Sequence, residues 1–170
     1  MEWNTVSISR KSIDEMTVSQ VSAEDAGEVA VMAGELLAEI MSAIGIQAFN
    51  FDLAETSKRL EDFLRQEKYF VFMARAADGR AIGFIALYES YALYAEGTFG
   101  TIPELYVRPS CRKQRVGYEL VSAAKSFAHS RGWKRLEVTT PPLPEFDRTQ
   151  AFYEREGFAI SGGRKLKISF

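Results

Sequence analysis

The spacing of apolar residues in the N-terminal part of the chain is that of a helix. From Val29 to Ile44 five apolar side chains follow one another at intervals of three or four residues, which places them on one helical face. Ser22 stands where a helix N-cap is expected, with Asp25 three residues later as a variant of the capping box, and Gly45 ends the pattern. We therefore expect the first helix to lie between Ser22 and Gly45.

Three further helices are indicated by the same period and by their start and stop residues. One begins at Asp52, which is followed three residues later by Glu55. The strongest amphipathic pattern covers Arg115–Arg131 and is stopped by Gly132. A short helix over Arg148–Arg155 comes near the end of the chain.

Shorter apolar runs bounded by turn residues predict strands. Pro103 lies inside one of these runs and has no N–H, so we expect a bulge or a break in pairing there. The element order indicates an α/β domain with a mixed, mostly antiparallel sheet of about seven strands flanked by about four helices. The predicted strands are Met16–Val21, Tyr69–Ala74, Ala81–Tyr91, Thr98–Val107, Trp133–Thr139, Phe158–Ser161 and Lys165–Phe170.

Length and charge narrow the class of protein. A chain of 170 residues fits one domain, which we expect over residues 15–170, with residues 1–14 as a flexible leader. The net charge of −2 gives no basic surplus for nucleic acid or a membrane surface. No apolar run approaches a membrane span and no signal-peptide pattern is present, so we expect a cytoplasmic protein. The single cysteine, Cys111, excludes an internal disulfide, and we expect no metal.

The segment Glu104–Val121 carries the clearest sign of a ligand. A strand ends, a polar loop turns and a helix begins, an arrangement whose exposed N–H groups and helix dipole bind phosphate. Arg112, Lys113 and Arg115 gather at this helix start, where cations are unfavourable unless an anion is bound, and Gly117 permits close approach. The other interpretation is a solvated basic turn before an amphipathic helix.

Two segments resemble motifs of the GNAT superfamily of N-acetyltransferases. Val107–Gly117 resembles the acetyl-CoA-binding motif, with Arg112 at its leading position and Gly117 at its final glycine. Arg115 stands where the family usually has its first glycine. Gln150–Phe158 resembles the C-terminal helix signature, in which a tyrosine is followed after three residues by Gly-Phe. The family's frequent Asn before this helix is absent here.

This resemblance implies a single-domain GNAT-like fold and transfer of an acetyl group from acetyl-CoA to a primary amine. The implied reaction is direct attack of the amine on the thioester. A non-catalytic CoA-binding module or sensor on the same fold is the alternative. The residues implied to bind acetyl-CoA are Leu105, Tyr106, Val107, Arg112, Lys113, Gln114, Arg115, Val116, Gly117 and Tyr118.

The same resemblance points to two catalytic residues. Glu104, next to the expected bulge, is the candidate base for the ammonium, or else an exposed carboxylate at a strand end. Tyr153 matches the family's tyrosine beside the sulfur, where a hydroxyl could protonate the departing thiolate, or else it is a core aromatic residue.

Two aromatic segments would border the acceptor in such a fold. Ala43–Asp52 and Tyr88–Gly97 combine aromatic rings with carboxylates, which suits a cationic amine of a small molecule or a peptide. A homodimer interface or simple core packing would explain the same residues. The candidate acceptor residues are Phe49, Phe51, Tyr88 and Tyr91.

Overall fold

A computed structural model of the chain describes residues 15–170, which form two compact units. The first unit ends at Thr139 and the second comprises Thr140–Phe170. The leader expected at residues 1–14 lies outside the described residues.

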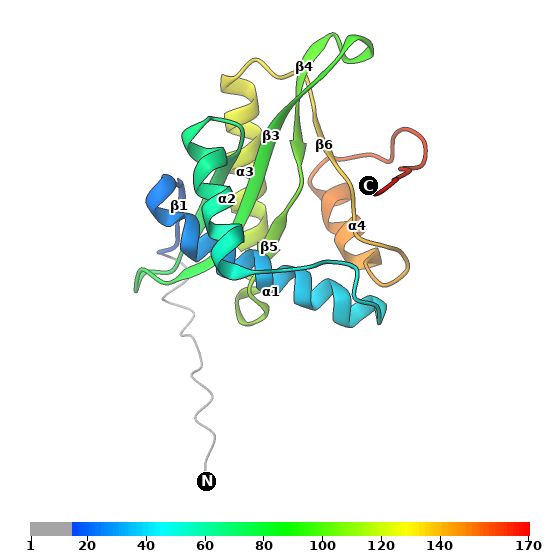
Figure 1. Cartoon of the computed structure of the whole chain (residues 1–170). Helices are drawn as coiled ribbons and strands as arrows, with labels where there is room; N and C mark the ends of the chain where they lie inside the picture. The colour runs from blue at the N-terminus through cyan, green and yellow to red at the C-terminus, as the bar shows by residue number, and fades with distance from the viewer. Residues whose placement is uncertain (1–14) are drawn as a thin grey trace. The chain divides into compact units, whose positions relative to one another are not determined.

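The described part of the first unit is built on a six-stranded sheet in the order β1-β2-β3-β4-β6, with β5 also paired to β3 (Figure 1). All pairs are antiparallel except β4 with β6, which run parallel. The mixed, mostly antiparallel sheet is therefore confirmed. The strands are β1 Thr17–Gln20, β2 Phe70–Arg75, β3 Ala81–Ala92, β4 Gly97–Ile102, β5 Leu105–Val107 and β6 Leu136–Val138.

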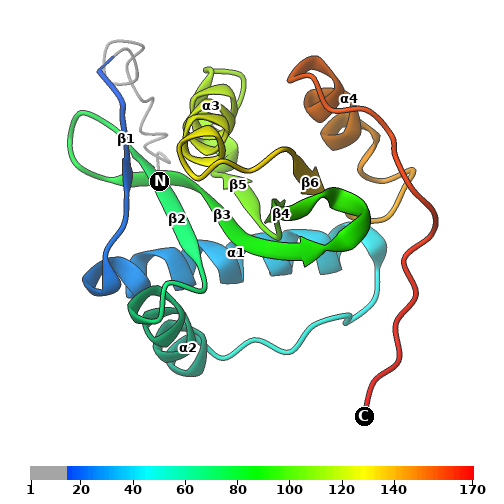
Figure 2. The same ribbon diagram turned by 90° about the horizontal axis from the view of Figure 1, so that it is seen from above.

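Three α-helices cover the two faces of this sheet, with α1 and α2 on one face and α3 on the other (Figure 2). Their bounds are α1 Ala26–Ile44, α2 Leu53–Arg65 and α3 Val116–Ser130. The predicted caps are present, since the Asp52 side chain accepts the Glu55 N–H at 2.8 Å and the Ser22 N–H donates to the Asp25 carboxylate at 2.9 Å. Gly45 ends α1 in the left-handed conformation that favours glycine, with φ 72°.

Side chains alternate across the sheet, so each strand contributes to two cores. On the face of α1 and α2, Val71 and Phe84 belong to the same buried cluster as Met32 and Leu60. On the other face the Phe70 ring lies 4.9 Å from the Phe127 ring of α3. The same alternation decides on which face of the sheet a side chain lies at the break between β4 and β5, that of α1 and α2 or that of α3.

The sheet opens where Pro103 and Glu104 interrupt what the sequence presents as a single strand. The expected strand Thr98–Val107 is two strands, β4 and β5, which confirms the predicted break at the proline. Strand β6 pairs with β4 along Gly100–Ile102, whereas β5 pairs with β3 alone among the described strands. The edge of β5 that faces away from β3 therefore has no strand beside it in the described part of the unit.

The second unit contains α4, Asp147–Arg155, close to its predicted span. The two strands predicted after it, Phe158–Ser161 and Lys165–Phe170, are wrong, because that stretch has no regular secondary structure. Its apolar residues alternate as in a strand, but Leu166, Ile168 and Phe170 are exposed. An alternating pattern makes a strand only where a neighbouring strand satisfies its backbone groups, and none pairs with this segment.

Candidate active site

Glu104 lies at the break between β4 and β5, with its side chain on the face of α1 and α2. Its carbonyl accepts the Ala86 N–H at 2.9 Å, and its carboxylate accepts a long hydrogen bond of 3.4 Å from the Tyr69 hydroxyl. Burial raises the pKa of Glu104 to about 7, while the hydrogen bond from Tyr69 acts in the opposite direction. The carboxyl therefore titrates near neutral pH, as a base for an amine requires.

Tyr69 is the residue of this site that sequence reasoning did not identify. Its ring stacks on Tyr88 with centroids 5.9 Å apart and is tilted against Phe63 at 5.4 Å. Burial, together with the charge of Glu104, raises the pKa of Tyr69, so its hydroxyl stays a hydrogen-bond donor. Strand pairing could have predicted this contact. Tyr69 precedes Phe70, which pairs with Leu87, so Tyr69 lies opposite Tyr88.

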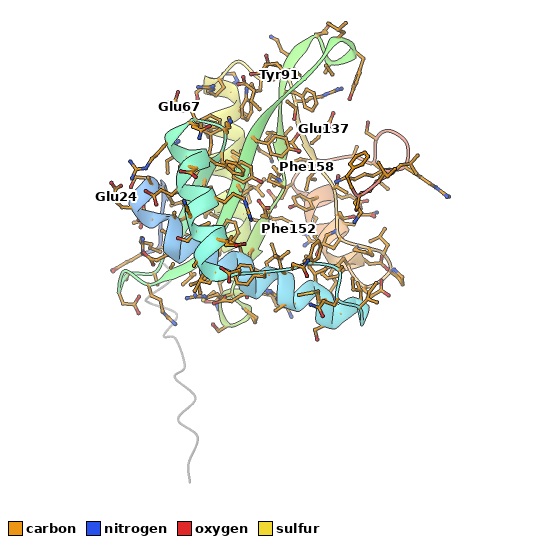
Figure 3. The ribbon with its side chains drawn as sticks, viewed as in Figure 1. Glu24, Glu67, Tyr91, Glu137, Phe152 and Phe158 are labelled. Carbon is orange, nitrogen blue, oxygen red and sulfur yellow. The ribbon has the colours of Figure 1, made fainter. Side chains whose placement is uncertain are left out.

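An aromatic cleft of about 440 Å³ adjoins these tyrosines at the C-terminal end of α2 and the projecting part of β3. Figure 3 labels two of its residues, Glu67 after α2 and Tyr91 on β3. Its walls carry four rings, and its polar lining is formed by Glu67, Lys68, Glu89 and Arg131. The four rings belong to Phe63, Tyr69, Tyr88 and Tyr91.

The structure divides the predicted acceptor residues into two pairs. Tyr88 and Tyr91 line the aromatic cleft together, but Phe49 and Phe51 do not. The Phe51 ring lies against Gly34 of α1, so close that a Cβ on that glycine would be 2.5 Å from two ring carbons. Phe51 precedes α2, and Phe63 near the end of α2 lines the cleft, so about 15 Å of helix lies between Phe51 and the cleft at 1.5 Å per residue.

The loop before α3 has the backbone form of an anion-binding site. Lys113 and Arg115 have positive φ angles of 62° and 66°, and α3 begins at Val116. No backbone hydrogen bond uses an N–H of residues 113–118 among those of residues 15–170 outside regular elements. Neighbouring N–H groups in such a turn, followed by the first turn of a helix, form a concave set of donors for phosphate.

Several side chains of this loop brace it rather than extend from it. Arg112 donates to the Val107 carbonyl at 2.9 Å and pairs with Glu39 of α1 at 2.6 Å. Gln114 donates to the Ser110 carbonyl at 3.0 Å. Arg112 and Gln114 therefore hold the loop in place through its own carbonyl groups and through α1.

The remaining loop side chains differ in their contacts. The Arg115 guanidinium lies 4.7 Å from the centre of the Tyr118 ring and 3.6 Å from the Glu119 carboxylate. Val116 is buried in the core. Within the described chain Lys113 is the only cation of the loop without an ion pair or ring contact.

Strand β5 contributes backbone groups to the open edge. The Glu104 carbonyl and the Arg108 N–H are bonded to β3, so by alternation Leu105 and Val107 direct their backbone groups the other way. The Tyr106 side chain is buried towards α1, where burial and Glu35 raise its pKa to about 12. Of the three predicted strand residues, Leu105 and Val107 thus present backbone groups at the opening.

Tyr153 belongs to the second unit and is buried. Its ring lies 5.4 Å from Phe152 and 5.3 Å from Phe158, the two phenylalanines labelled in Figure 3. Burial raises the pKa of its hydroxyl, which therefore stays protonated at neutral pH. No hydrogen bond joins that hydroxyl to another residue within the described chain.

Residues 15–170 contain neither a metal-binding cluster nor a membrane-spanning helix. No group of three or more His, Cys, Asp or Glu side chains could hold a metal ion in this range. In the same range no helix has the length and apolar character needed to span a membrane. Cys111 is buried beside the loop and carries no disulfide.

Comparison with known proteins identifies the family. Residues 37–158 match the acetyltransferase (GNAT) family, a span that includes both sequence motifs and the aromatic cleft. The chain therefore belongs to the GNAT family of acetyltransferases, and the acyltransferase class expected from the sequence is confirmed.

Two curated relatives match parts of the chain. One is an aminoalkylphosphonate N-acetyltransferase of Salmonella typhimurium, 33% identical over 92 residues, or 53% of this chain and 57% of the relative. The other is an aminoglycoside N(6')-acetyltransferase type 1 of Klebsiella aerogenes, 44% identical over 66 residues, or 36% of this chain and 42% of the relative. The chain thus spans about half the length of the relatives it matches.

Solved structures share the fold over almost the whole chain. A probable acetyltransferase has a TM-score of 0.73 and 25% identity, covering 91% of this chain and 99% of that one. A predicted acetyltransferase with acetyl-CoA from Clostridium acetobutylicum also has a TM-score of 0.73, at 14% identity, covering 91% and 96%. The GNAT-like fold expected from the motifs is therefore confirmed.

Replacing Arg115 tests the backbone of the phosphate loop. Glycine adopts positive φ without steric cost, so we expect Arg115→Gly to be more stable than Arg115→Ala by about 1 kcal/mol. Both variants lose the contacts of the arginine side chain, so their difference isolates the backbone. Urea unfolding of the two variants measures it, and equal stabilities would show that position 115 does not hold the left-handed conformation.

Proposed function

We propose that this protein is an N-acetyltransferase that transfers an acetyl group from acetyl-CoA to the primary amine of a small molecule. The observation that carries the proposal is the position of Glu104. Its carboxyl, with a pKa near neutral, stands where β4 and β5 separate and the sheet leaves one edge of β5 open. A base beside unpaired strand groups is what attack on a thioester requires.

The donor set at α3 supports acetyl-CoA as the co-substrate. The pyrophosphate of CoA is an anion, and the loop offers unpaired N–H groups from Lys113 to Tyr118 at a helix N-terminus. Leu105 and Val107 offer backbone groups for the amide-containing arm of CoA. Acetyl-CoA supplies the activated acetyl group, and the chain supplies binding, orientation and proton transfer.

The reaction balances when the substrate nitrogen loses two protons and the CoA sulfur gains one. Glu104 takes a proton from the substrate ammonium, whose ordinary pKa is near 10. The amine nitrogen then attacks the thioester carbon, so a C–N bond forms and the C–S bond breaks. Tyr153 donates its hydroxyl proton to the departing thiolate in this proposal, since burial raises its pKa and keeps it protonated until then. The nitrogen, which is cationic after its attack, gives its second proton to the tyrosinate so formed, and the proton held by Glu104 leaves to solvent.

The acceptor is proposed to be a small molecule. The two curated relatives are named for acetylation of aminoalkylphosphonates and aminoglycosides, both small molecules with amines. The aromatic cleft, which Tyr69 links to Glu104 through its hydroxyl, has a volume typical of small-molecule sites. A peptide amine, a homodimer and a location in the cytoplasm remain expectations from the sequence.

The pH dependence of catalysis tests Glu104 as the base. Because the base must be ionised, we expect kcat/KM to rise through about pH 7 and then level off. Glu104→Gln removes the base, so its activity should fall by about 10²-fold or more and rise only as the amine itself loses its proton near pH 10. Initial rates of CoA release between pH 5 and about 10 measure both profiles.

The pH dependence of the free energy of unfolding is a second test of the raised pKa of the Glu104 carboxyl. Its pKa is raised on folding, so its stabilising contribution is full below pH 4.5 and is lost as the pH rises through about 7. Glu104→Gln should lack this loss and unfold at higher urea than the wild type above pH 7.

A wild-type rate profile that is flat through pH 7 would exclude Glu104 as the base.

Removal of one hydroxyl tests Tyr153. Tyr153→Phe keeps the ring between Phe152 and Phe158, so stability should change by at most about 1 kcal/mol. If the hydroxyl protonates the thiolate, kcat should fall on the order of 10²-fold with little change in acetyl-CoA affinity. Single-turnover rates and calorimetric binding separate the two effects. A wild-type rate in the variant, with chemistry limiting, would leave Tyr153 as a packing residue.

A further inference from the structure

We propose that the aromatic cleft holds the body of the acceptor, and that it selects a primary amine carrying one aromatic ring and a single positive charge. This inference rests on the proposed N-acetyltransferase function and adds the class of its substrate. Three observations carry it: the hydrogen bond by which Tyr69 links the cleft to Glu104, the composition of its walls and the balance of its charges.

Tyr69 connects the cleft to the candidate base. Its ring lines the cleft, while its hydroxyl is 3.4 Å from the Glu104 carboxylate. Tyr88 stacks on the same ring and also lines the cleft. A molecule bound against these two rings therefore lies within one tyrosine side chain of the carboxyl that would take its proton.

The walls of the cleft favour an aromatic body. Four rings from three separate segments line an open cleft of about 440 Å³, which is enough for a small molecule. Aromatic pairs prefer offset or edge-to-face contact, and rings at different orientations offer both to a bound ring. The same tyrosine faces attract an ammonium group, which suits the amine end of the substrate.

The cleft has equal numbers of carboxylates and cations, and some of these groups already bond to other residues. Two carboxylates, Glu67 and Glu89, are matched by two cations, Lys68 and Arg131. Glu89 already accepts hydrogen bonds from the Tyr91 hydroxyl, the Trp133 indole and the Arg131 guanidinium. The cleft therefore offers Glu67 as its one carboxylate that is not bonded within the described chain.

This charge balance argues against the substrates for which the two relatives are named. A polycationic aminoglycoside would need several free carboxylates, and the cleft has one. An aminoalkylphosphonate carries a strong anion, and Arg131 is already paired with Glu89 at 3.3 Å and lies over the Phe70 ring at 5.0 Å. Lys68 is then the one cation of the cleft left to bind a phosphonate, and most of the wall is formed by rings, which do not bind an anion.

The experiment compares three amines on the full-length protein. The probes are 2-phenylethylamine, 2-aminoethylphosphonate and kanamycin. Binding of each to the acetyl-CoA-saturated protein is measured by calorimetry, and turnover is followed by CoA release. We expect 2-phenylethylamine to bind most tightly and to have the highest kcat/KM of the three.

A matched pair of variants assigns the binding to the cleft. Tyr88→Leu removes one ring of the wall, so the Kd and KM for 2-phenylethylamine should rise about tenfold while acetyl-CoA affinity is unchanged. Tyr94→Leu is the control, because Tyr94 is exposed on the hairpin and does not line the cleft. The control should bind the amine as the wild type does.

The outcomes separate this inference from the proposed function. Tighter binding or faster turnover of kanamycin or 2-aminoethylphosphonate would overturn the aromatic substrate class and leave the acetyltransferase intact. Equal affinity of Tyr88→Leu and wild type for 2-phenylethylamine would overturn the cleft as its site. If 2-phenylethylamine binds through Tyr88 but no amine is acetylated, the proposed function fails and the binding site stands.

Discussion

The arrangement of the candidate site depends on a break in one strand. A proline inside a strand cannot donate to the ladder, and Pro103 stands where the chain passes from β4 to β5. Beyond that point β6 no longer continues the sheet, because it pairs with β4 alone. The break therefore produces two features together: an open backbone edge on β5, and Glu104 held beside it with a pKa near neutral.

A second constraint acts on the loop that follows β5. Arg112 joins the Val107 carbonyl to Glu39 of α1, which fixes the loop at the end of the strand. Lys113 and Arg115 then take left-handed conformations, at a cost of roughly 1–2 kcal/mol per residue for side chains other than glycine. That cost is understandable where it turns several N–H groups towards one ligand, as an anion site requires.

The sequence predicted the helices, the break at Pro103 and the polar turn before α3, because each depends on local residue types. A proline, a helix cap and a glycine-containing turn act through their own backbone. Tyr69 was missed because its role comes from Glu104, 35 positions away, and from the stacking of Tyr88. The separation of Phe51 from Tyr88 was also missed, since it follows from the length of α2 and the contact with Gly34.

The most direct measurement is calorimetric titration of acetyl-CoA into three forms of the protein. The proposal requires the wild type to bind at one site per chain, and Gly117→Val, at the start of α3, to bind about tenfold more weakly or not at all. Ser126→Val, exposed later on the same helix, should bind as the wild type does. A wild-type protein that does not bind acetyl-CoA, or a Gly117→Val variant with unchanged affinity, would contradict the assignment of this loop as the CoA site.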